Sequence, residues 1–186
     1  MAPAECMTER SSPSPRRPGN GPVARVGATL RGALLALAAL LAAACGGDDG
    51  GGEGGSSQKD NGDFVVEWEP GARGLAKALK DEELFEDLAG ALNKGFKLPR
   101  DLPIVHTACN EVNAFWDPQS RQLLMCYELL EAITDISSQL AEDDEELVER
   151  ALGTWMFVFF HELGHGLVDY YDLPITGREE DAVDDF

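Results

Sequence analysis

A segment from about Asp144 to Tyr171 contains no proline and can form one long helix, which Pro174 prevents from continuing. Residues 155–160, WMFVFF, are almost wholly apolar, so we expect this helix to be buried. The acidic run Glu142–Glu146 supplies caps and first-turn carboxylates at its start. The helix is therefore expected inside the folded domain.

The sequence HELGH occupies residues 161–165, within this expected helix. Two histidines at i and i+4 stand on one helical face, about 5–6 Å apart at Cβ, so His161 and His165 can reach one zinc ion. Glu162 is rotated by roughly 100° from His161 and can accept a proton from an attacking water. This pattern is typical of zinc metallopeptidases. The alternative is a histidine pair that is hydrogen-bonded in a core without metal.

A catalytic zinc ion normally has a third protein ligand. The metzincin pattern would need a glycine at Val168 and a histidine at Tyr171, so it is absent. Glu180 and Asp184 instead resemble the Glu-x-x-x-Asp element of the thermolysin-like zincins, the gluzincins. That resemblance implies Glu180 as the third zinc ligand.

In the same resemblance Asp184 does not bind the metal but orients His161 from behind. Glu179 and Asp181 remain alternatives for the third ligand. A solvated acidic tail is the alternative for the whole element.

The first 44 residues read as an export signal. Five arginines precede an apolar stretch, Ala33–Ala44, which is too short to cross roughly 30 Å of hydrocarbon comfortably. The stretch ends in small residues directly before Cys45, which resembles the lipobox of bacterial lipoproteins, although Ala42 stands where leucine is commonest. We therefore expect Cys45 to carry lipid. The alternative is an ordinary cleaved signal peptide with an incidental cysteine.

Residues 45–62 are rich in glycine, serine and aspartate and are expected to form a flexible tether. With Cys6 in the signal and Cys45 lipidated, Cys109 and Cys126 remain. In an oxidising compartment two such cysteines flanking a hairpin are expected to form a disulfide. Two reduced, buried thiols are the alternative.

From residue 63 the composition is that of a globular domain. Alternation over residues 64–68 predicts a strand, and helical spacing over 75–92 predicts one helix or two helices broken near Asp81, with Gly95 as the stop. We expect strands at 104–108 and 122–126 around a turn at 117–120, and a helix over 127–140. The expected fold is α+β, zincin-like and dominated by helices, with a small antiparallel sheet or hairpin.

Nearly all of residues 64–186 resembles one family of exported bacterial proteins of unknown function that carry a metallopeptidase-like domain. The resemblance is carried by LPRDLPI, by the two cysteines with NAFWDP between them, by CYE, by HELGH and by LPITGREEDAVD. It implies a zincin-like peptidase domain over residues 63–186. Members continue past the acidic element, which leaves open whether the domain that ends at Phe186 is truncated.

The formal net charge of −19 disfavours nucleic acid as a partner, because such a surface repels phosphate backbones. The leading hypothesis is a zinc-dependent peptidase, anchored by lipid in the cell envelope, that hydrolyses peptide or protein substrates. In a Gram-negative cell that means the outer membrane or the periplasmic face. The alternatives are a non-catalytic lipoprotein whose structural or vestigial zinc site binds a partner, and an envelope lipoprotein without metal.

Four further residues have an expected role or are candidates for one. His106, on an expected strand beside Cys109, is more typical of a structural residue than of a ligand. Tyr170, Tyr171 and Arg178 could each stabilise an oxyanion, and the sequence does not select among them.

Overall fold

The computed structural model describes residue 28 and residues 60–184. The expected signal of residues 1–44 (apart from residue 28), the lipidation residue Cys45 and the tether up to residue 59 lie outside the described residues. No helix in the described part of the chain combines the length and the apolar character that a membrane crossing needs.

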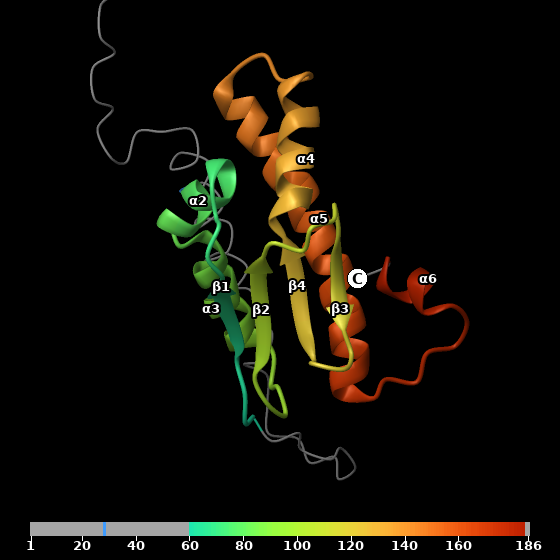
Figure 1. The fold of residues 1–186 in the computed structure, drawn as a ribbon. Helices are drawn as coiled ribbons and strands as arrows, with labels where there is room; N and C mark the ends of the chain where they lie inside the picture. Colours follow the sequence, from blue (N-terminus) through green and yellow to red (C-terminus); the bar gives the residue numbers. More distant parts are fainter. Residues whose placement is uncertain (1–27, 29–59, 185–186) are drawn as a thin grey trace, which may run out of the picture.

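The described residues form an α+β fold with a four-stranded mixed sheet and five helices (Figure 1). In chain order the elements are β1 (Phe64–Trp68), α2 (Gly74–Asp81), α3 (Leu84–Gly95), β2 (Leu102–Thr107), β3 (Ala114–Asp117), β4 (Gln122–Cys126), α4 (Tyr127–Ser138), α5 (Asp144–Tyr171) and α6 (Glu179–Val183). The predicted break near Asp81 separates α2 from α3, and the predicted long helix is α5.

The strand order is β1-β2-β4-β3, and only the β3–β4 hairpin is antiparallel. The expected small antiparallel sheet is wrong, because β1 pairs with β2, and β2 with β4, in parallel, whereas the expected hairpin is present as β3–β4. Parallel neighbours need a long connection. Helices α2 and α3 supply it between β1 and β2, whereas the chain between β2 and β4 first forms β3 and returns.

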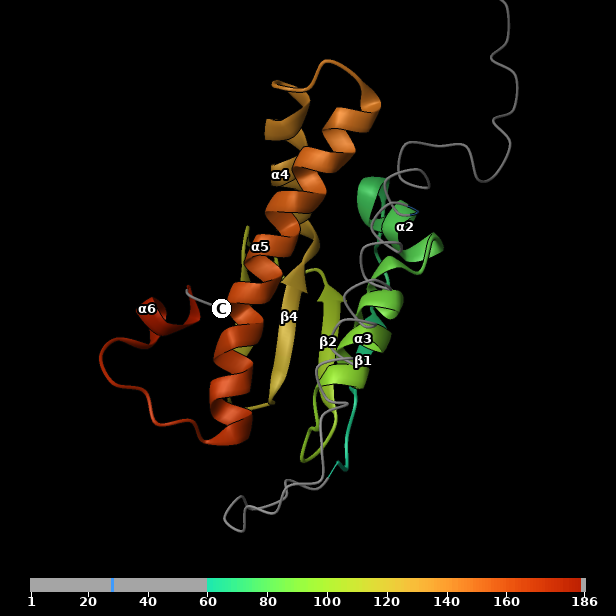
Figure 2. The same ribbon diagram turned by 180° about the vertical axis from the view of Figure 1, so that it is seen from behind.

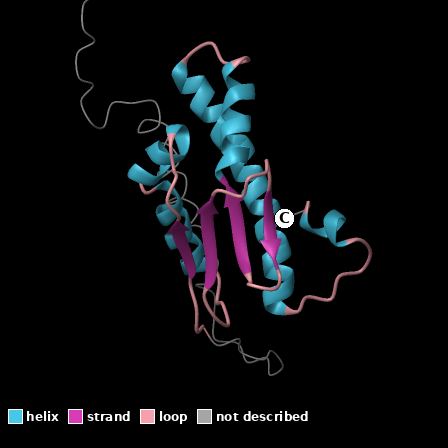
Figure 3. Cartoon of the chain, viewed as in Figure 1, coloured by secondary structure: helices cyan, strands magenta, loops and turns pink. Residues whose placement is uncertain are grey.

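Helices α3 and α5 cover the same face of the sheet, behind it in Figure 1 and in front of it in Figure 2. Figure 3 shows the strands as one layer, with α4 and α5 extending together beyond its end. The core between the layers includes Trp155 and Phe159 of α5 and Phe85 of α3, none of which is more than 1% exposed.

Helix α5 is only partly buried along its apolar segment. Its first turn is capped as expected, since the Asp143 side chain accepts hydrogen bonds from the backbone N–H groups of Glu145 and Glu146. Phe157 and Phe160, however, are 66% and 41% exposed. The expectation that the whole WMFVFF segment is buried is wrong, because the sheet and α4 cover one side of this helix only.

Candidate metal centre

The two histidines of HELGH lie one turn apart on α5, and their side chains are 22% and 16% exposed. Their ring centroids are 5.1 Å apart and their planes are nearly perpendicular. Spacing of i and i+4 on a helix brings His161 and His165 together in this way. The expected shared face of α5 is therefore present.

Helix α6 adds a carboxylate to this face. Oε2 of Glu180 lies 3.4 Å from Nε2 of His161 and 3.6 Å from Nε2 of His165. One ligand atom from each of these three residues lies within 4.8 Å of the others. Two imidazoles and one carboxylate form the donor set of a catalytic zinc site that keeps a further position open. The residues therefore fit a zinc ion.

Two more carboxylates contact the opposite nitrogens of the same rings. Oδ1 of Asp184 lies 2.9 Å from Nδ1 of His161, and Oε1 of Glu179 lies 2.7 Å from Nδ1 of His165. An ionised carboxylate can only accept, so each Nδ1 must donate its hydrogen. In a neutral imidazole this leaves the lone pair on Nε2, the nitrogen near Glu180.

The three acidic residues considered as third ligand, Glu179, Glu180 and Asp181, differ in their positions relative to the histidines. Glu180 is the acidic residue whose oxygen lies close to both Nε2 atoms, whereas Glu179 contacts Nδ1 of His165. The convergent group of described residues contains Glu180 and does not contain Asp181. The geometry thus favours Glu180 among the three, and it gives Glu179 a position that mirrors that of Asp184.

Helix α6 can approach α5 because residue 164 is a glycine. A Cβ atom added to Gly164 would lie 2.9 Å from Cβ of Val183 and 3.1 Å from its Cγ1. Val183 is 2% exposed and lies between Glu180 and Asp184 in sequence. The contact between Gly164 and Val183 therefore sets how closely α6, with its acidic residues, approaches α5.

Strand β3 contacts α5 at Glu162, the residue after His161. The backbone N–H of Trp116 donates a hydrogen bond of 3.0 Å to Oε2 of Glu162. The ring of Trp116 lies over Gly166, where an added Cβ would be 3.1 Å from Cε3, and packs edge-on against Tyr170. The hydrogen bond holds the Glu162 carboxylate against β3, because β3 is the edge of the sheet and its Trp116 N–H points to α5.

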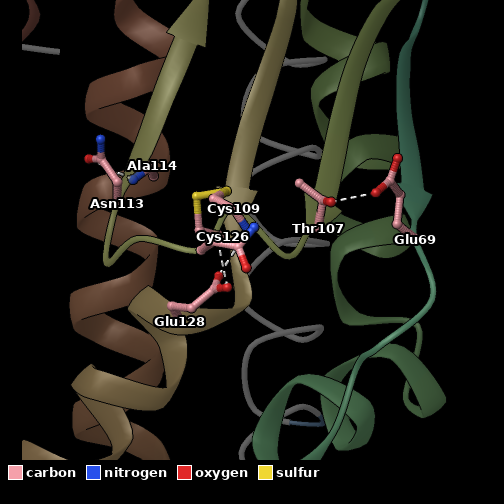
Figure 4. Close-up of a disulfide and its surroundings, with 8 residues drawn as sticks. Glu69, Thr107, Cys109, Asn113, Ala114, Cys126 and Glu128 are labelled. Atoms are coloured by element: carbon pink, nitrogen blue, oxygen red, sulfur yellow. Dashed lines mark hydrogen bonds between the residues drawn. A yellow bond between two sulfur atoms is a disulfide. The ribbon is translucent and has the colours of Figure 1, made fainter.

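The predicted disulfide between Cys109 and Cys126 is confirmed, with the two Cα atoms 5.4 Å apart. As expected, the two cysteines flank a hairpin, which is formed by β3 and β4. Cys126 ends β4 opposite Thr107 in the neighbouring parallel strand, and Cys109 follows that strand by two residues. The bridge closes the chain segment that contains β3 (Figure 4).

Glu128 reinforces the same loop from below the disulfide (Figure 4). Its carboxylate accepts hydrogen bonds from the backbone N–H groups of Cys109 and Asn110, at 3.0 and 2.8 Å. The bond from Cys109 is the largest of the effects that lower the pKa of Glu128. The loop is thus tied at Cys109 before it enters β3, the strand that contacts Glu162.

The remaining candidates are His106, Tyr170, Tyr171 and Arg178, none of which belongs to the convergent group. His106 is 1% exposed and stacks on Trp68 at 3.9 Å between centroids, and burial lowers its pKa to about 3. The hydroxyls of Tyr170 and Tyr171 donate to the backbone carbonyls of Asp101 and Lys97. His106 is therefore a core residue, and the two tyrosines hold the loop before β2 to the end of α5. Arg178 precedes α6 as its N-cap residue, without a side-chain capping bond.

Comparison with known proteins gives one family. Residues 68–186 match the family model described as "Putative metallopeptidase", and the chain belongs to this family. No curated protein and no solved structure matches the chain. The family supports a peptidase that uses a metal, and the convergent histidines and glutamate lie within the matched residues.

Proposed function

We propose that this protein is a zinc-dependent metallopeptidase of the gluzincin type, in which His161, His165 and Glu180 hold the metal. The observation that carries the proposal is the convergence of their ligand atoms within 4.8 Å. The second support is Glu162, which follows His161 in the sequence and whose carboxylate is held by the backbone N–H of Trp116. A bound zinc ion would polarise the carbonyl of the scissile peptide bond and make a neighbouring water more acidic.

Glu162 is proposed as the general base. Its carboxylate is held by the Trp116 N–H through one oxygen, and a carboxylate can take a proton through the other. The proton removed from the attacking water can then pass to the leaving amine, so that one residue acts first as base and then as acid. Both half-reactions need the carboxylate to stay in place, which the backbone bond to β3 supports.

Asp184 and Glu179 are proposed to hold the two rings in the orientation that binds metal. Each accepts a hydrogen bond from Nδ1, which fixes the tautomer and makes Nε2 a better ligand. We expect Asp184→Asn to weaken zinc binding about 10–100-fold, whereas Glu180→Ala removes a ligand and should cost more.

The decisive experiment compares zinc content and peptide hydrolysis in the full chain and in Glu162→Gln. The variant retains the shape of the side chain but cannot accept the proton, so zinc should stay while hydrolysis falls by a factor on the order of 10² or more. Glu149→Gln is the matched control, since Glu149 is an exposed residue of the same helix. If the chain binds zinc but cleaves no peptide, it is a zinc-binding lipoprotein instead.

We also propose that the protein is a lipoprotein of the cell envelope, anchored through Cys45. The support is the sequence alone: an apolar segment that ends at this cysteine and a glycine-rich tether after it. The confirmed disulfide agrees with an oxidising compartment. Intact-mass analysis of the membrane fraction should show a lipidated Cys45 at the N-terminus, and soluble protein that begins elsewhere would reject the anchor.

A further inference from the structure

Helix α6 has little support from the hydrophobic core. It consists of Glu179–Val183, and residues 172–178, which form neither helix nor strand, join it to α5. Figures 1 and 2 show it beside α5 at the end of this loop, away from the sheet. Val183 is the single buried residue between positions 172 and 184. Apolar burial therefore contributes little to holding this segment in place.

A segment of this kind is not expected to hold its position by itself. An isolated helix shorter than about 12–15 residues is marginal in water, and ordering the backbone of each residue costs free energy. Against this cost, residues 172–184 bury one valine side chain, over Gly164. The other contacts between this segment and α5 described above join the carboxylates of Glu179, Glu180 and Asp184 to the two histidine rings.

The contact that Glu180 makes is unfavourable unless a cation lies between it and the histidines. Both Nδ1 atoms donate their hydrogens, to Asp184 and Glu179, so in neutral imidazoles each Nε2 atom carries a lone pair. Oε2 of Glu180 lies 3.4 and 3.6 Å from these two Nε2 atoms. A carboxylate is also an acceptor, so neither pair can form a hydrogen bond while the rings are neutral. A zinc ion is bound by the same three donor groups.

We propose that zinc binding controls the docking of α6: the helix docks on α5 when zinc binds and leaves it when the metal is removed. His161 and His165 stay in place in both states, because α5 is anchored in the core. They bind the metal first, and Glu180 joins them as α6 docks. The inference rests on the proposed function, since it assumes zinc at these three residues. It adds that the complete ligand set exists only in the zinc-bound chain.

The test is amide hydrogen exchange with millisecond labelling, measured by mass spectrometry on the full chain at pH 8, where imidazole is neutral. The metal-free chain is compared with the chain saturated with zinc, and bound zinc is measured in the same samples. Zinc should slow the exchange of residues 179–184 at least about tenfold. Exchange in α3, which packs against β1, should not change.

Two variants, each of which removes one negative charge from α6, separate metal ligation from a general effect of charge. Glu180→Ala should still bind zinc at saturating concentration through the two histidines, but the exchange of residues 179–184 should stay fast. Asp181→Asn is the matched control, because Asp181 is the exposed neighbour of Glu180 and does not belong to the convergent group. It should keep the zinc-dependent protection. Magnesium, which prefers oxygen ligands, should give no protection in the wild-type chain.

The outcomes separate this inference from the proposed function. If zinc binds but residues 179–184 exchange at the same rate with and without it, zinc does not control the docking of α6 and only this inference fails. The same conclusion follows if Glu180→Ala keeps the protection or if magnesium provides it. If the wild-type chain binds no zinc, the proposed metal site fails and the inference fails with it. If zinc binds and protects α6 but no peptide is cleaved, the inference stands and the proposed peptidase activity fails.

Discussion

Gly164→Ala should weaken zinc binding at the proposed metal centre, although residue 164 is not itself a proposed ligand. The new Cβ would lie 2.9 Å from Cβ of Val183, whereas apolar carbons in contact normally stand about 3.5–4.0 Å apart. One of the two helices must therefore move by roughly 0.6–1.1 Å. Helix α6 will yield, because it is five residues long and carries one buried side chain, while α5 is anchored in the core.

That displacement moves Glu180 and Asp184 together, since both lie on α6 or at its end. A hydrogen bond of 2.9 Å between Asp184 and His161 would lengthen to more than about 3.4 Å, which is beyond the usual range. Loss of such a supporting contact typically costs 10–100-fold in metal affinity, and we expect a loss of at least that size here, because a ligand moves as well. The stability of the metal-free chain should change little, since the helix propensity of alanine, worth about 1 kcal/mol over glycine, opposes the strain of overpacking.

The assay is competition for zinc against a fluorescent chelator, with unfolding measured by urea on the metal-free chain. Gly153→Ala is the matched control: Gly153 belongs to the same helix, and an added Cβ there meets nothing within 4 Å. This control should gain about 1 kcal/mol of stability and keep its zinc affinity. If Gly164→Ala binds zinc as tightly as Gly153→Ala does, the packing of Val183 on α5 does not position the ligands and the reasoning fails.

Two further perturbations test the scaffold. Replacing Cys109 and Cys126 by alanine removes a cross-link between residues 17 apart in sequence. The free energy of unfolding, measured by urea titration, should fall by about 3 kcal/mol. Equal urea midpoints for the oxidised wild type and the variant would contradict this. Burial lowers the pKa of His106 to about 3. Below about pH 6.5 the unfolded chain therefore binds a proton at this residue that the folded chain does not bind, so the free energy of unfolding should fall as the pH drops from 6.5 toward 3. We expect a loss of about 3 kcal/mol from this residue between pH 7 and pH 4, absent in His106→Phe; equal pH slopes in the two proteins would show that His106 is not the cause.

The elements that the sequence predicted well are those with a local signal. Alternation placed β1, and the acidic cap and Pro174 placed the two ends of α5. The strand partners were not predictable in the same way, because pairing depends on where connections cross the sheet. β3 is a strand of four residues with no clear alternation of its own, and its insertion at the edge left β4 beside β2 in parallel.

The same division applies to the site. His161, Glu162 and His165 follow from helical spacing, which is a property of adjacent residues. The N–H of Trp116 has no side-chain signal at all, so its bond to Glu162 could be found only from the placement of β3. Gly164 and Gly166 did carry a signal: glycine is costly inside a helix, and two of them around His165 indicate close approach of other elements.

The choice between Glu179 and Glu180 shows why helical spacing alone could not complete the ligand set. Successive residues on a helix point about 100° apart, so whichever glutamate faces the histidines, its neighbour faces elsewhere. Which one does so depends on how α6 is rotated about its own axis. Val183 constrains that rotation, because its burial against Gly164 places one side of this short helix on α5. With Val183 facing α5, the residue one turn before it, Glu180, faces the Nε2 atoms, and Glu179 reaches around to Nδ1 of His165. The proposed ligand set thus depends on an apolar contact, that of Val183 with Gly164, which neither histidine makes.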